Sequence, residues 1–107
     1  MSNNELRKEL RQILAVLDAE RQAIAALDLD AITIAANDKL ALCRSIDGLG
    51  PIELDDECKA LLMTARDCNE TNKQMRNLVA ANISNRIDML TGSPRLYGAK
   101  RYADMSS

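Results

Sequence analysis

Apolar positions follow helical spacing in three segments of the chain. In residues 5–27 the apolar stripe steps by three and four residues, and Glu20 fills one stripe position, which predicts an amphipathic helix. The apolar members of this stripe are Leu6, Leu10, Ile13, Leu17, Ile24 and Leu27. Asn3 or Asn4 is expected to cap the helix, because Asn side chains accept the free N–H groups of a first turn.

The stripe changes register at the end of this segment. The step from Leu27 to Ile32 is five residues, and Asp30 is the expected N-cap of a second helix. No Gly or Pro enforces a break, so one kinked helix remains an alternative to two helices. The second stripe comprises Ile32, Ala35, Ala36, Leu42, Cys43 and Ile46. Lys39 shares this stripe, and we interpret it as a lysine whose methylenes cover the core edge while its ammonium stays in water.

Turn residues separate the second segment from the third. Gly48 suits a left-handed position after a helix, and Pro51 cannot continue one. Asp55 then has the side chain and place of an N-cap. The third helix is expected over residues 56–91, about 54 Å long, with Gly92 and Pro94 ending it.

The two halves of the third helix differ in apolar width. The stripe of the first half spans roughly 120° and consists of Cys58, Leu61, Leu62, Ala65 and Cys68. The arc of the second half spans roughly 180° and consists of Met75, Leu78, Val79, Ile83, Ile87, Met89 and Leu90. Asn72, Asn82 and Arg86 fall on stripe positions, and we expect the asparagines to lie solvated at the edge. The wide arc indicates a partner surface, a central place in the protein's own bundle, or a homodimer interface.

These elements predict an all-α fold. We expect an up-down bundle of about three helices, arranged as a long antiparallel coiled-coil-like hairpin with the third helix longest. Near absence of aromatic residues and rarity of Gly and Pro agree, because strands favour aromatic residues and need turns. Residues 1–94 form the predicted bundle domain, and residues 95–107 form a flexible C-terminal tail.

Composition narrows the function classes. The chain has no His, and the three cysteines lack metal or disulfide spacing, so we expect no enzyme, no metal and no cofactor. The net charge of −2 disfavours nucleic acid as a partner. No leader or apolar run of spanning length is evident, which predicts a cytoplasmic protein without stable membrane insertion.

Three short motifs occur in order along the chain. The first is Leu27-Asp28 followed by Lys39-Leu40-Ala41-Leu42. The second is the helix end from Asn85 to Gly92, which closes on Leu-x-Gly. The third is Arg95-Leu96-Tyr97-Gly98. In this order and spacing they resemble the FlgN family of flagellar export chaperones, which often has Gly at the position of Leu27 and a Tyr-Gly motif in its tail.

The resemblance implies a function. Such proteins are helical chaperones of type III flagellar export that bind C-terminal helical segments of hook–filament junction proteins of the FlgK/FlgL type. They deliver these clients to the export gate and its ATPase complex. The implied client site is Met75, Leu78, Val79, Ile83, Arg86, Ile87 and Leu90. Tyr97 is the implied contact with the export gate. A homodimeric coiled-coil scaffold without a client is the alternative.

Overall fold

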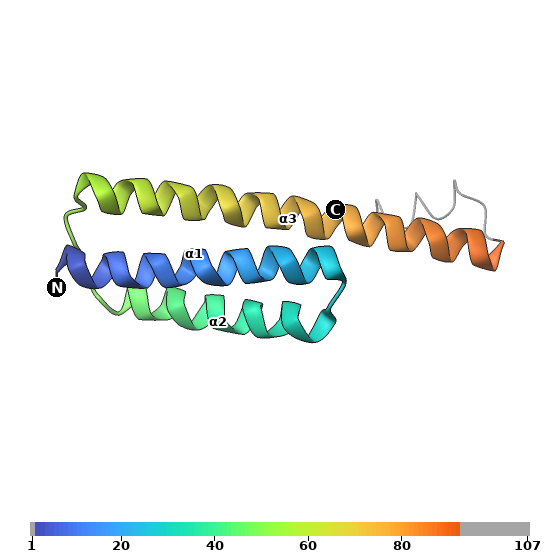
Figure 1. The fold of residues 1–107 in the computed structure, drawn as a ribbon, viewed down its shortest axis with the longest axis horizontal. Coiled ribbons are helices and arrows are strands. Elements are labelled where there is room, and N and C mark those ends of the chain that lie inside the picture. Colours follow the sequence, from blue (N-terminus) through green and yellow to red (C-terminus); the bar gives the residue numbers. More distant parts are fainter. Residues whose placement is uncertain (1, 93–107) are drawn as a thin grey trace. The chain divides into compact units, whose positions relative to one another are not determined.

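The computed structural model describes residues 2–92 and contains three helices (Figure 1). They are α1 (Asn3–Ala26), α2 (Leu29–Asp47) and α3 (Asp56–Thr91). The predicted all-α fold with a longest third helix is confirmed, and the described residues include no strand. The chain divides into two compact units, Met1–Lys73 and Gln74–Ser107, which are described separately. The predicted tail 95–107 lies outside the described residues.

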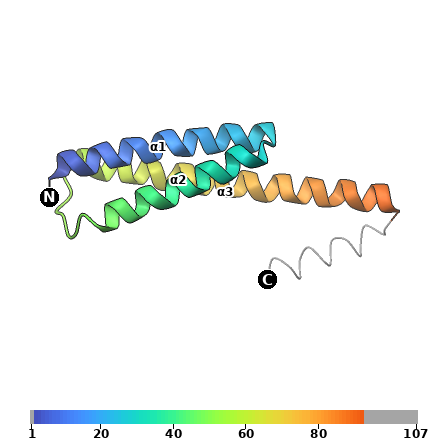
Figure 2. The same cartoon turned by 90° about the horizontal axis from the view of Figure 1, so that it is seen from below.

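The first unit holds α1, α2 and the first half of α3. α2 runs antiparallel to α1, and the first half of α3 returns alongside α1 in the direction of α1 (Figures 1 and 2). The predicted stripe of α1 supplies most of the core. Two clusters cross from α1 to α3, one built from Leu6, Leu10 and Cys58 and the other from Ile13, Leu17 and Ala65. In contrast, Ala35 alone is buried among the residues of α2.

α1 and α2 are separate helices, which settles the alternative that the sequence left open. Leu27 takes the left-handed conformation at φ 56°. Its N–H donates to the Ile24 carbonyl at 3.1 Å, and the Asp28 N–H donates to the Ala23 carbonyl at 3.0 Å. These two bonds form a Schellman motif that ends α1. Asp28, not the expected Asp30, caps α2, because its side chain accepts the Ala31 N–H at 3.1 Å.

Leu27 is therefore a strained position, and its substitution gives a stability prediction. A residue with a Cβ pays roughly 1 kcal/mol or more in the left-handed region, and glycine does not. Leu27→Gly is expected to exceed Leu27→Ala in stability by about 1 kcal/mol, measured by urea unfolding. Comparing the two small residues removes the contribution of the half-exposed leucine side chain. Equal stabilities would show that the motif does not hold this conformation in solution.

The connector between α2 and α3 departs from expectation in one detail. Gly48 is right-handed at φ −69°, so the left-handed position expected there is wrong, and Gly50 at φ 79° takes that role instead. The reason is hydrogen bonding, since Gly48 still donates to the Arg44 carbonyl at 3.0 Å and extends the last turn of the helix. Gly92, with φ 71°, follows the end of α3 as expected.

Asp55 caps α3 as predicted. Its carboxylate accepts the Cys58 N–H at 2.8 Å and pairs with the Arg7 guanidinium at 3.0 Å. The backbone hydrogen bond from Cys58, with Arg7 beside it, lowers the pKa of the Asp55 carboxyl below its ordinary 3.8. A lowered pKa means that this contribution to stability is present above pH 4 and is lost as the pH falls through the folded-state value.

The start of α1 is fastened to this connector. Ser2, and not the expected Asn3 or Asn4, caps α1 by accepting the Glu5 N–H at 3.4 Å. The Asn3 side chain instead links the start of α1 to the connector that precedes α3. It donates to the Glu53 carbonyl at 3.1 Å and accepts the Asp55 N–H at 3.3 Å. The Asn3 side chain is therefore used to position α3 against α1.

Candidate functional site

The second half of α3, Gln74–Thr91, carries the client site implied by the sequence resemblance. No residue from 74 to 92 is buried. Leu78 is 66% exposed and Leu90 is 87% exposed. Ile83, Ile87 and Met89 are also exposed, whereas Met75 and Val79 are partly covered. We call Met75, Leu78, Val79, Ile83, Ile87 and Leu90 the α3 arc.

The polar residues implied for this site or expected beside it are exposed where the structure describes them. Arg86 is exposed on the same helix and is available to an acidic partner. Asn82 is exposed as expected. Tyr97, the implied contact with the export gate, lies outside the described residues. The α3 arc is therefore an apolar helix face with the exposed Arg86 beside it.

A buried polar cluster in the first unit corrects two sequence interpretations. Asn72 was expected at a solvated edge but is only 1% exposed. Its Nδ2 donates to the Leu17 carbonyl at 2.8 Å and to Glu20 Oε1 at 2.9 Å. Lys39 was expected to place its ammonium in water, yet Nζ lies 3.1 Å from Glu20 Oε2 and 2.9 Å from Asn69 Oδ1.

The physical reason is the position of Glu20 in the apolar stripe of α1. Glu20 is 2% exposed, and a carboxylate at such depth needs hydrogen bonds and a cation. Lys39 from α2 and Asn72 from α3 provide these contacts. Each of these three residues is a polar side chain at an apolar stripe position of its helix. The sequence does not show that they meet, because that depends on which helices face one another. The cluster joins all three helices of the first unit.

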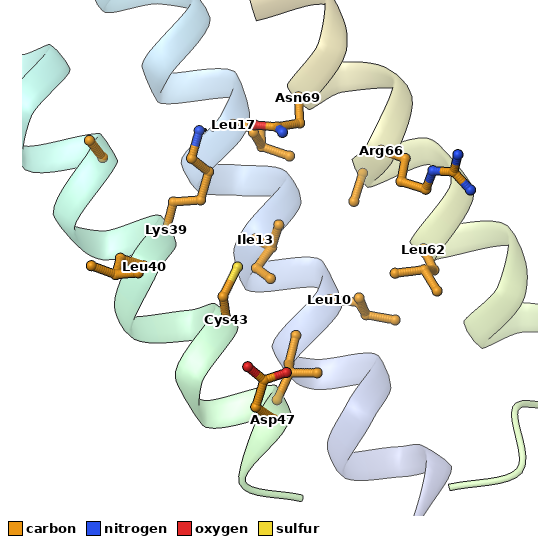
Figure 3. A pocket seen from close by; sticks show the side chains of 13 residues that line it. Leu10, Ile13, Leu17, Lys39, Leu40, Cys43, Asp47, Leu62, Arg66 and Asn69 are labelled. Atoms are coloured by element: carbon orange, nitrogen blue, oxygen red, sulfur yellow. Dashed lines mark hydrogen bonds between the residues drawn. The ribbon is translucent and has the colours of Figure 1, made fainter. Parts of the chain in front are cut away.

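Beside this cluster the first unit has an apolar groove of about 570 Å³ (Figure 3). We call it the α2–α3 groove. α1 lies between α2 and α3 in this view and contributes the groove floor. The lining residues are Leu10, Ile13, Leu17, Ala36, Lys39, Leu40, Cys43, Ile46, Asp47, Leu62, Ala65, Arg66 and Asn69. The groove is not evident from the sequence, because Leu62 and Cys43 have the same spacing as the residues of the packed stripes.

The cysteines do not form a chemical site. Cys43 is exposed, Cys68 is partly covered and Cys58 is buried, and all three are free thiols. Burial raises the pKa of the Cys58 thiol, with the Asp55 carboxylate as a further cause. The thiol form is thereby favoured, and thiolate reactivity is suppressed. Among the described residues no group of His, Cys, Asp or Glu is arranged to hold a metal ion.

Comparison of this chain with known proteins gives no relative from which a function could be inferred. No protein family, curated protein or solved structure matches this chain. None of the described helices is long and apolar enough to cross a membrane. The interpretation of function therefore rests on the two apolar surfaces and on the sequence motifs.

Proposed function

We propose that this protein is a type III flagellar export chaperone that holds C-terminal helical segments of hook-associated proteins on the α3 arc. The observation that carries the proposal is the exposure of this arc. Leu78, Ile87 and Leu90 are exposed on one helical segment that has no buried residue of its own among residues 74–92. Apolar surface of this kind marks a contact site for a partner.

The chemistry of the arc suits an amphipathic client helix. Such a helix lays its apolar face on an exposed apolar stripe, with anchors spaced three and four residues apart. The methionine in the arc, Met75, adapts its unbranched side chain to different client surfaces. Arg86 would face acidic residues of the client and would affect the rate of association more than the affinity.

The rest of the proposal follows the sequence motifs. Tyr97 in the tail 95–107 would contact the export gate, so client and gate would be bound by different parts of the chain. In this proposal the protein acts in the cytoplasm as a binding protein and not as an enzyme. The proposed partners are the client, the export gate and the export ATPase complex. A homodimeric scaffold without a client is the competing function.

A direct binding measurement tests the client site. C-terminal helical segments of hook-associated proteins from the same source are titrated into the protein and followed by calorimetry. Val79→Asp/Ile83→Asp is expected to weaken binding by at least about tenfold, because two carboxylates would be desolvated against the client's apolar face.

The matched control is Asn77→Asp/Ser84→Asp. It adds the same charge to the same helical segment, on the side opposite the arc, and is expected to leave the affinity unchanged. Circular dichroism checks that both variants keep their helices. Absence of binding by the wild type, together with a dimer on sizing that Val79→Asp/Ile83→Asp dissociates, would instead support the scaffold.

A further inference from the structure

The α2–α3 groove exists because α2 and α3 each carry a second apolar face beside the one that packs on α1. On α2, the inward positions include Ala35 and Ile46, and the adjacent face presents Leu40 and Cys43, both exposed. On α3, Leu62 is 41% exposed next to the core-facing stripe. A closed three-helix bundle would press these two faces together. Here they remain as facing walls above α1 (Figure 3).

The groove has the length of a short helix. At one end the hydrogen bond from Lys39 to Asn69 joins the two walls. Toward the other end, a second hollow of about 190 Å³ shares Leu10, Ile46 and Leu62 with the groove and reaches Ile52 and Leu54 in the connector. The floor runs along α1 from Leu6 to Leu17, which corresponds to about 17 Å, or roughly three helical turns.

Each wall of the groove carries one charged side chain that has no ion-pair partner among the described residues, and these two charges are opposite. Asp47 lies at the last residue of α2, and Arg66 lies on α3. Among residues 2–92 neither side chain forms an ion pair. The helix dipole opposes a carboxylate at a helix C-terminus, so a cation supplied from outside would stabilise Asp47. Lys39 on the α2 wall is already paired with Glu20 and Asn69, so Asp47 and Arg66 are the lining charges left for a partner.

We propose that the α2–α3 groove binds an amphipathic partner helix of about three turns, with basic residues on the flank that meets Asp47 and acidic residues on the flank that meets Arg66. The apolar stripe of the partner contacts Leu40, Cys43 and Leu62, which completes a four-helix arrangement. This surface is separate from the α3 arc and does not depend on the proposed export function.

Three helix-stabilised peptides of about three turns test the proposal. Each has leucines spaced three and four residues apart, and the flanks carry Lys on one side and Glu on the other, Lys on both, or Glu on both. Fluorescence anisotropy measures their binding to the full-length protein. The mixed peptide is expected to bind about two- to fivefold more tightly than the other two, the range for exposed charge pairs.

Charge variants of the walls should change this preference independently of the peptide's direction in the groove. Arg66→Glu makes both walls acidic and is expected to favour the peptide with Lys on both flanks. Asp47→Lys makes both walls basic and is expected to favour the peptide with Glu on both flanks. Both residues are exposed, so neither change removes a core contact.

A pair of variants on α2 locates the site. Leu40→Asp in the groove is expected to weaken the mixed peptide by at least about tenfold, and Ile34→Asp, which is also exposed but lies outside the groove, is expected to change nothing. Equal binding by the two variants, or no binding by the wild type, would overturn the proposal. A wild-type dimer that only Leu40→Asp dissociates would overturn it too, since the occupant would then be a second copy.

Discussion

Asn72→Asp is expected to destabilise the first unit by roughly 3 kcal/mol or more, although it changes a single side-chain group. Asn72 Nδ2 donates 2.9 Å to Glu20 Oε1 and 2.8 Å to the Leu17 carbonyl. The substitution replaces this donor by a carboxylate oxygen and brings two like charges together at a position that is 1% exposed. Urea unfolding at pH 7 measures the loss.

The same variant has a defined pH dependence. Two carboxyl groups at hydrogen-bond distance cannot both ionise without cost, so the folded variant would bind a proton that the unfolded chain releases. More protons bound in the folded state means that stability increases as the pH falls. Part of the loss is therefore expected to return between about pH 7 and pH 5.

Asn69→Asp is the matched control, three residues earlier on the same helix. Asn69 Oδ1 accepts from Lys39 Nζ at 2.9 Å, so the new charge would meet an ammonium group at a largely exposed position. The expected change in stability is within about 1 kcal/mol in either direction. Similar losses in both variants would mean that the Glu20 cluster is not formed as described.

Leu10→Ala is expected to lower the free energy of unfolding by about 3–4 kcal/mol. Leu10 is 1% exposed and packs with Leu6 and Cys58, with Ile46 and Ile52 from other segments against that cluster. Truncation loses the transfer free energy of the removed isopropyl group and leaves a cavity that the rigid helices fill only in part. Denaturant unfolding measures the loss. An unchanged slope of the unfolding free energy against denaturant concentration would show that only the stability has changed.

Leu40→Ala provides the comparison for the same chemical change. Leu40 is 51% exposed in the wall of the groove, so its truncation is expected to cost less than about 1 kcal/mol in the isolated protein. If both leucines cost the same, the wall of the groove would be covered in solution. That result would contradict the open groove and favour a closed bundle.

Local sequence signals predicted the helix limits to within a few residues, although the caps of α1 and α2 and the left-handed glycine lie one or two residues from the expected positions. Asp55 was identified as a cap since a carboxylate just before a helical segment accepts its free N–H groups. The left-handed conformation of Leu27 is not evident from the sequence. A leucine gives no sign of a left-handed conformation, and it is the Schellman hydrogen bonds that hold it there.

The two candidate surfaces also differ in whether the sequence predicts them. The α3 arc was visible in the sequence, because an apolar width of roughly 180° on one helix is a property of spacing alone. The groove was not, since Leu62 and Cys43 have the same helical spacing whether they meet another helix or line an open space. The open space between α2 and α3 decided that outcome.

By itself, the sequence determined the helical segments, their limits within a few residues, and the stripe of α1 that forms the core, because these depend on short-range spacing. The structure decided that α1 and α2 are separate helices. The tertiary structure decided how the polar stripe residues are used. The buried carboxylate belongs to Glu20 on α1. Its partners Lys39 and Asn72 come from α2 and α3, so only the packing of the three helices explains why it can be buried. Desolvation makes such a charge costly when unpaired, so the packing of the helices and the pairing of these side chains are decided together.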